Sequence, residues 1–215
     1  MMKRMLRPMI LTMSVLTFSA TAHAAPFTIT LDTSSLSGTQ TVMFGLTDFD
    51  TSSNMVVLSD FVFGGGSAVT GSADCTFGGT FSGLGCSGDL TSGVVLQDLD
   101  PPATFFTQQF EPGAAFSFVL NTTNNFTGPT PDQFALYVCD ASGSTCYSDD
   151  AASAALLLLD LAGSTLSPAS FVTFGASGEG LPAPVITAAV PEPGMLLLFA
   201  IGAASAALRR RHRVR

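Results

Sequence analysis

Phe27-Thr28-Ile29-Thr30-Leu31 decides the fold class, because apolar and polar side chains alternate along it. Alternation with a period of two places Phe27, Ile29 and Leu31 on one face, which is typical of a half-buried β-strand. Other segments have the same strand character: Gln40–Leu46, Met55–Phe63, Val94–Leu99, Thr104–Phe110, Ala114–Leu120, Gln133–Cys139 and Ser170–Phe174. Short strands at this spacing predict one all-β sandwich, jelly-roll-like or immunoglobulin-like in architecture.

Turn signals separate the predicted strands, since Gly, Pro, Asn, Asp and Ser adopt turn conformations readily. They are Ser37-Gly38, Gly64-Gly65-Gly66, Asp100-Pro101-Pro102, Glu111-Pro112-Gly113 and Gly128-Pro129. The 18 phenylalanines, most of them within the strand segments, are the expected main filler of the core.

The segment Asp149–Gly163 is ambiguous, because a continuous apolar run suits a helix or a buried strand equally. A helix over Ala151–Leu159 would have two aspartates in its first turn, where negative charge is favourable. We favour a strand over Ala155–Leu161, because the surrounding segments are all β.

The charges are distributed very unevenly. The chain has 215 residues and a formal net charge of −8, yet no Lys, Arg or His occurs from Ala25 to Val190. Every acidic residue except Glu192 lies in that stretch. A body without cations cannot neutralise phosphates, which excludes nucleic acid as a partner. It also lacks the imidazole on which most catalytic triads and zinc sites rely, so we expect no enzyme activity.

Residues 1–24 have the three parts of a secretory signal peptide. A basic start precedes an apolar run from Met9 to about Ala20, and Ala22 and Ala24 supply small residues at positions −3 and −1 of a cleavage site. The basic residues are Lys3, Arg4 and Arg7. A retained anchor is the alternative, but the run is too short to span a bilayer. We expect cleavage after Ala24 and a mature chain that begins at Ala25.

The C-terminal region has a different arrangement. Val190-Pro191-Glu192-Pro193-Gly194 precedes an apolar run from Met195 to Leu208, and Arg209-Arg210-Arg211 follow. As a helix, Gly194–Leu208 would rise only about 22 Å, short of a hydrocarbon core of roughly 30 Å. We therefore predict a single short transmembrane helix whose arginine cluster stays in the cytoplasm.

This order of motif, short helix and arginines resembles the PEP-CTERM sorting signal, over residues 190–215. Such signals occur on exported proteins of Gram-negative bacteria and are read by exosortase, an integral-membrane enzyme. The resemblance implies that Pro191, Glu192 and Pro193 are the sorting motif and that Arg209, Arg210 and Arg211 hold the tail for processing. The protein would be anchored transiently in the inner membrane and then delivered to the cell surface or the extracellular space. An ordinary tail anchor is the alternative.

Some PEP-CTERM proteins are similar across the body too. The shared segments are Phe27–Ser34, Gly64–Gly66, Phe106–Gly113 and Thr130–Phe134. That subfamily has no assigned activity. We expect the β-sandwich ectodomain to occupy residues 25–180, and residues 181–189, rich in Pro and Ala, to be a spacer before the sorting signal.

The four cysteines form two local couples, Cys75/Cys86 and Cys139/Cys146. Export through the periplasm allows disulfides, and three connectivities exist. The local one is favoured because each couple brackets a Gly/Ser-rich turn. Neither couple has the spacing of a metal site, so we expect no transition-metal centre.

Paired aspartates offer oxygen ligands for Ca²⁺, the one cofactor that the sequence supports. Asp48 and Asp50 are the main candidates, and Asp98-Leu99-Asp100 is a second pair. The EF-hand pattern is not met, and hydrated aspartates at strand ends are the plain alternative.

The resemblance associates the protein with exopolysaccharide-producing bacteria. The leading expectation is a structural or adhesive role in the exopolysaccharide or biofilm matrix, with exosortase, the export machinery and exopolysaccharide as partners. A low-charge surface rich in Ser, Thr and Gly suits weak multivalent contacts. The alternative is a calcium- or carbohydrate-binding module of the cell surface, although the chain has no Trp and only two Tyr to stack against sugars.

Overall fold

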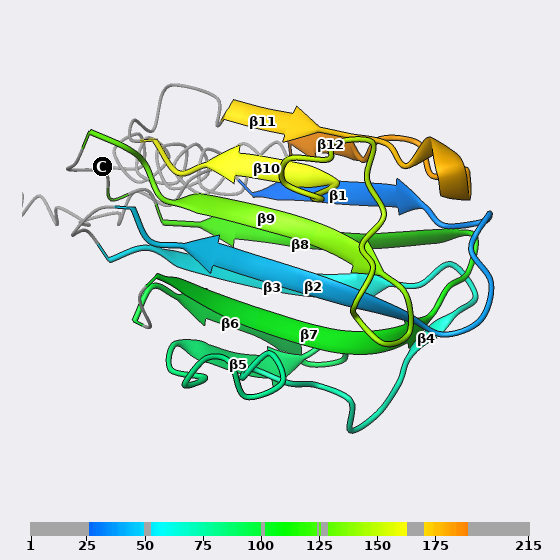
Figure 1. The fold of residues 1–215 in the computed structure, drawn as a ribbon, viewed down its shortest axis with the longest axis horizontal. Coiled ribbons are helices and arrows are strands. Elements are labelled where there is room, and N and C mark those ends of the chain that lie inside the picture. The colour runs from blue at the N-terminus through cyan, green and yellow to red at the C-terminus, as the bar shows by residue number, and fades with distance from the viewer. Residues whose placement is uncertain are drawn as a thin grey trace, which may run out of the picture.

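The computed structural model describes residues 26–49, 53–99, 102–123, 125, 129–162 and 170–188. These residues form two six-stranded antiparallel sheets that pack face to face (Figure 1). The first sheet has the order β12-β1-β8-β3-β6-β5 and the second the order β11-β10-β9-β2-β7-β4. The strands are β1 (Phe27–Asp32), β2 (Gln40–Thr47), β3 (Met55–Val62), β4 (Ser67–Ala68), β5 (Cys86–Asp89), β6 (Gly93–Gln97), β7 (Ala103–Glu111), β8 (Ala115–Thr122), β9 (Gln133–Cys139), β10 (Leu157–Asp160), β11 (Ser170–Thr173) and β12 (Val185–Ala188). The described part of the chain contains no α-helix, only the 3₁₀ turn η1 (Ser177–Glu179).

Alternation of side chains produces these strands, as the sequence predicts. Along β8, Phe116, Phe118 and Leu120 are buried while the residues between them are partly exposed. Each predicted segment overlaps a strand, and the all-β sandwich is confirmed.

Phenylalanine rings fill the space between the sheets. Phe44 of β2 is fully buried, and its ring centroid lies 5.3 Å from that of Phe118, which belongs to the opposite sheet. The rings of Phe106 and Phe134 lie 6.0 and 6.2 Å from it on the neighbouring strands. Such aromatic clusters bury large apolar surface areas and so stabilise the packing of the two sheets against each other.

The ambiguous run forms a strand. β10 pairs with both β9 and β11, and Leu157 and Leu159 are buried. The preceding aspartate, Asp150, accepts hydrogen bonds from Ser153 in a turn and does not start a helix. The strand prediction is confirmed, although β10 is shorter than the predicted Ala155–Leu161.

The structure differs from the predicted spacer at residues 181–189. Leu181 is buried, and Val185–Ala188 forms β12, which pairs with β1 so that Ile186 faces Ile29. The sandwich therefore extends to residue 188. Pro182 and Pro184 suggested a linker, but a strand that begins just after a proline at the edge of a sheet loses no ladder hydrogen bond.

Two predicted turns pack directly against each other. A Cβ atom on Gly66, in the turn after β3, would lie 1.9 Å from the main-chain oxygen of Glu111 at the end of β7. One on Gly113 would lie 2.2 Å from the oxygen of Phe63. Glycine is required at both positions because two backbones meet there.

The predicted signal peptide, with Ala22 and Ala24, and the C-terminal tail, with the predicted sorting motif and the predicted transmembrane helix, lie outside the described residues. Within the described ranges no helix is long and apolar enough to cross a membrane.

Candidate functional site

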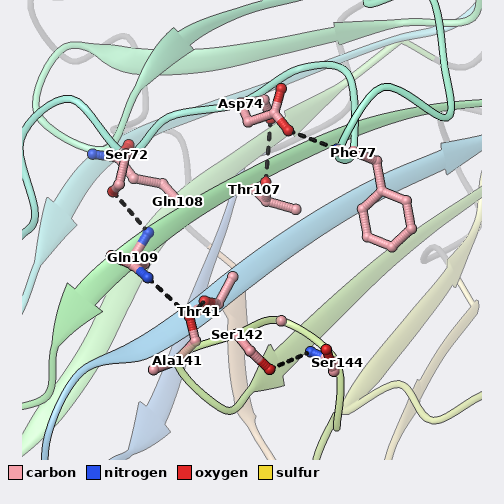
Figure 2. A pocket seen from close by; sticks show the side chains of 12 residues that line it. Thr41, Ser72, Asp74, Phe77, Thr107, Gln108, Gln109, Ala141, Ser142 and Ser144 are labelled. Atoms are coloured by element: carbon pink, nitrogen blue, oxygen red, sulfur yellow. Dashed lines mark hydrogen bonds between the residues drawn. The ribbon is translucent and has the colours of Figure 1, made fainter.

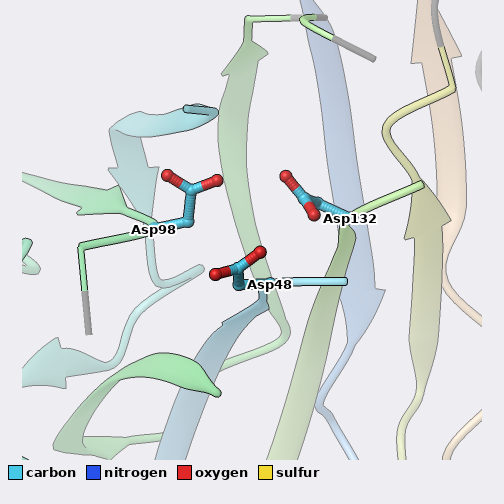
Figure 3. Close-up of side chains that lie close together, drawn as sticks. All are labelled: Asp48, Asp98 and Asp132. Carbon is cyan, nitrogen blue, oxygen red and sulfur yellow. The ribbon is translucent and has the colours of Figure 1, made fainter. Parts of the chain in front are cut away.

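Three aspartates meet at one end of the sandwich (Figure 3). Asp48 follows β2, Asp98 follows β6, and Asp132 comes directly before β9. One carboxylate oxygen from each lies within 4.8 Å of the others. The two sheets both contribute, because β6 belongs to the first and β2 and β9 to the second. We call this group the aspartate cluster.

Asn54 holds two members of the aspartate cluster in place. Its side-chain Nδ2 donates to Oδ2 of Asp132 at 2.7 Å, and its backbone N–H donates to Oδ2 of Asp98 at 2.9 Å. Asp132 is fully buried, and its other oxygen accepts a hydrogen bond from the N–H of Phe49 at 2.9 Å. These bonds orient the carboxylates, which is the arrangement that a preformed cation site needs.

Asp98 is the electrostatically strained member. Its Oδ1 is buried and accepts no hydrogen bond from the described residues. The pKa of Asp98 is raised to about 6, chiefly by burial and also by the neighbouring carboxyls of Asp132 and Asp48, against the lowering effect of the hydrogen bond from the Asn54 N–H. A protonated Asp98 can donate a hydrogen bond to Asp132, whereas an ionised one leaves like charges together. The cluster is therefore suited to hold either a proton or a cation.

The sequence found part of this cluster. It named Asp48 and Asp98 but paired each with the aspartate two residues later, and Asp50 and Asp100 lie outside the described residues. The structure instead brings Asp48 and Asp98 to Asp132, which the sequence patterns did not single out as a ligand. The available signal was the position of Asp132 between Pro131 and an alternating strand, which places a carboxylate at a strand end.

A second feature is a pocket of about 700 Å³ on the outer face of the second sheet (Figure 2). Its floor is formed by outward side chains of β2 and β7, where Thr41 lies opposite Gln109 in the strand register. One wall comes from the loop around Asp74 and Phe77, the other from residues 141–144. Because the walls are the Cys75–Cys86 and Cys139–Cys146 loops, we call this the interloop pocket.

The C-terminal region supplies the evidence on family. Residues 189–211 match the family model of the PEP-CTERM protein-sorting motif. The chain carries a PEP-CTERM motif. The match includes Pro191, Glu192 and Pro193 and the Arg209–Arg211 cluster. No curated protein and no solved structure matches the chain.

The PEP-CTERM motif marks an exosortase-targeted extracellular protein, exported and processed at the membrane. Exported proteins pass through an oxidising compartment, where disulfides form. Both disulfides of the chain have the local pairing that the sequence favours. The Cα atoms lie 5.6 Å apart in Cys75–Cys86 and 3.8 Å apart in Cys139–Cys146.

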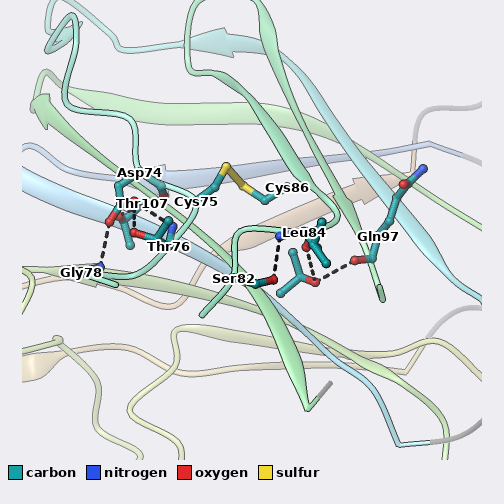
Figure 4. Close-up of a disulfide and its surroundings, with 10 residues drawn as sticks. Asp74, Cys75, Thr76, Gly78, Ser82, Leu84, Cys86, Gln97 and Thr107 are labelled. Atoms are coloured by element: carbon teal, nitrogen blue, oxygen red, sulfur yellow. Dashed lines mark hydrogen bonds between the residues drawn. A yellow bond between two sulfur atoms is a disulfide. The ribbon is translucent and has the colours of Figure 1, made fainter. Parts of the chain in front are cut away.

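The first disulfide loop is also tied down by Asp74 (Figure 4). Its carboxylate accepts hydrogen bonds from the N–H groups of Thr76 at 2.7 Å and Gly78 at 2.8 Å. Its backbone N–H donates to the oxygen of Thr107 on β7 at 2.8 Å. The bonds from Gly78 and Thr76 lower the pKa of Asp74, which is therefore ionised at neutral pH.

Proposed function

We propose that this PEP-CTERM protein has a non-catalytic, structural or adhesive role in the exopolysaccharide matrix of the bacterium that exports it. The match of residues 189–211 to the sorting motif carries the proposal. The composition of the body supports it. A stretch without Lys, Arg or His and rich in Ser, Thr and Gly favours weak, repeated contacts with a hydrated polymer.

In the proposed route, the signal peptide is cleaved after Ala24 and the tail holds the protein in the inner membrane until exosortase acts. We expect Pro191 and Pro193 to disfavour a helix around Glu192, because proline cannot continue a helix and disfavours helix in the residue before it. An extended segment next to the membrane is open to an enzyme. Processing would then release the sandwich from the arginine cluster.

The first test is the intact mass and location of the protein in its own host, with Glu192→Ala as the variant. The wild type should begin at Ala25, lack Arg209–Arg215 and lie outside the inner membrane. Glu192→Ala should accumulate with its C-terminus intact. Glu179→Ala is the matched control, because Glu179 is an exposed glutamate in the η1 turn and should be processed normally.

Wild-type protein that keeps Arg209–Arg215 would refute exosortase processing. Processed protein found only in the culture medium, and never in the washed matrix fraction, would refute the structural or adhesive role while leaving the sorting route intact.

The aspartate cluster favours a second candidate function, binding of Ca²⁺. Calcium prefers carboxylate and carbonyl oxygens, and Asp48, Asp98 and Asp132 would each contribute a carboxylate oxygen. The buried, unpartnered Oδ1 of Asp98 fits a cation, which would supply the interaction that the described residues do not. A bound cation would join loops from both sheets and so stabilise that end of the sandwich.

Thermal unfolding of the full chain at pH 7, with EDTA or with Ca²⁺, tests this candidate. Ca²⁺ at 100 times its Kd should stabilise the wild type by about 2.7 kcal/mol, and Mg²⁺ should act more weakly. Asp98→Asn should abolish the effect of Ca²⁺. Asp60→Asn, a change at an exposed aspartate on β3, should keep it. Equal midpoints in EDTA and Ca²⁺ would exclude a structural calcium site.

A further inference from the structure

The floor of the interloop pocket offers hydrogen-bonding groups in fixed positions. The Nε2 of Gln109 donates to the main-chain oxygen of Ala141 at 2.8 Å, and its backbone N–H donates to Oγ of Ser72 at 3.0 Å. Gln109 therefore ties the floor to both walls (Figure 2). Its Oε1 accepts no hydrogen bond from the described residues and remains able to accept one from a ligand hydroxyl.

An aromatic ring stands at the rim. Phe77 is 36% exposed, and its ring stacks on Phe105 with centroids 5.5 Å apart. Phe105 in turn lies against Gly45, where a Cβ atom would come within 2.7 Å of the ring. Phe77 has a φ of 48°, a conformation that is unfavourable for a bulky side chain. The backbone at Phe77 is thus held in a conformation that this residue type disfavours, and its ring is partly exposed. An exposed aromatic ring can pack against the apolar face of a sugar.

The negative charge at the interloop pocket disfavours anionic ligands and favours uncharged ones. The pocket has the ionised Asp74 on one wall, and no Lys, Arg or His occurs from Ala25 to Val190. A polyanion would be repelled and would find no cation to pair with. An uncharged molecule rich in hydroxyl groups can instead donate to the carboxylate of Asp74 and to Gln109.

We propose that the interloop pocket binds a segment of an uncharged polysaccharide. The inference rests on the proposed matrix role and names the site and chemistry by which the sandwich would hold the matrix. A volume of about 700 Å³ lies within the usual range of ligand pockets, roughly 300–1000 Å³. The two disulfides stiffen both walls, so little ordering entropy opposes binding.

The test is calorimetric titration of the full chain, held in a detergent whose headgroup carries no sugar. The probes are neutral hexasaccharides of glucose, galactose, mannose and N-acetylglucosamine, with a galacturonic acid hexamer as the anionic comparison. We expect at least one neutral hexasaccharide to bind and the anionic one not to bind. Gln109→Ala and Phe77→Ala should each weaken binding roughly tenfold or more.

Two matched variants control for general damage. Gln133→Ala removes a partly exposed glutamine from the same sheet, whose Nε2 likewise makes one hydrogen bond, to Asp160 at 2.9 Å. Phe49→Ala removes a phenylalanine that is 51% exposed beyond the other end of β2. Both should bind as the wild type does.

No binding of any neutral hexasaccharide, or equal loss in the pocket and control variants, would overturn the inference. Its failure is separable from failure of the proposed function. Wild-type protein that stays in the washed matrix but binds no sugar would overturn only the pocket. Protein that binds sugar through Gln109 and Phe77 but never enters the matrix would overturn only the matrix role.

Discussion

Asp98 shows how a single residue couples the sandwich to its solution conditions. Its Oδ1 is buried without a hydrogen-bond partner among the described residues, and Asp48 and Asp132 lie within 4.8 Å. With no Lys, Arg or His in the body, the negative charge can be offset only by a proton or a solution cation. The same carboxyl therefore destabilises the folded protein at neutral pH when it is ionised without a cation, and is a candidate ligand when a cation is present.

When EDTA removes cations, the free energy of unfolding should depend on pH in a way that shows the destabilisation by ionised Asp98. The pKa of Asp98 is raised to about 6 in the folded protein, whereas an unfolded aspartate has a pKa of about 3.9. Between these values the unfolded chain loses the proton first, so the contribution of Asp98 to stability falls as pH rises from about 4 to 6 and is constant above.

Asp98→Asn removes this loss while keeping an oxygen for the Asn54 N–H. The difference in unfolding free energy between variant and wild type should therefore shift in favour of the variant between pH 4 and 6.5. Measuring that difference cancels the other carboxylates, such as Asp89, whose pKa is lowered to about 2 by hydrogen bonds from Thr91 and Ser92. A difference that does not change with pH would show that Asp98 titrates normally.

At the level of elements, two disulfide loops and one late strand complete the sandwich. The first loop joins β4 of the second sheet to β5 of the first, the second loop follows β9, and residues next to or within each line the interloop pocket. β12 adds to β1 at the edge of the first sheet and brings the chain back along the sandwich before the sorting motif. The last strand and the start of the matched motif are therefore adjacent, at residues 188 and 189.

Removing a disulfide should measure how far each loop constrains the unfolded chain. In the chain-entropy model, each closure stabilises by about 2.5–3 kcal/mol. The Cys75→Ser/Cys86→Ser double variant should lose slightly more than Cys139→Ser/Cys146→Ser, because its sequence separation is 11 rather than 7. Urea unfolding of the full chain gives both values, and wild type treated with dithiothreitol should match the combined loss. Losses well below 1 kcal/mol would show that the loops are ordered without their disulfides.

At the level of the whole molecule, the candidate sites are separated along β2. The aspartate cluster lies beyond Thr47 at one end, and the interloop pocket lies over Thr41 toward the other. Cation binding and polymer binding can therefore be tested independently on one protein.

Local patterns account for what could be predicted. The alternation along Phe27–Leu31 and along the other alternating segments is a property of neighbouring residues. The strands could therefore be predicted from the sequence. The local disulfides followed from short separations. β4 (Ser67–Ala68), β5 (Cys86–Asp89) and β12 were not predicted, because none has a clear alternating pattern and each owes its conformation to pairing with an existing strand.

The amino-acid order alone specifies an all-β body, its two local disulfides and a tail with the PEP-CTERM motif, because each is encoded within a short window of residues. Only the tertiary structure decides that Asp132 joins Asp48 and Asp98, and that Phe77 and Gln109 share a pocket with Ala141. The proximity of these residues, which are far apart in the sequence, depends on the order of the strands in the two packed sheets. Strand order follows from long-range pairing and burial, which no local window of the sequence contains.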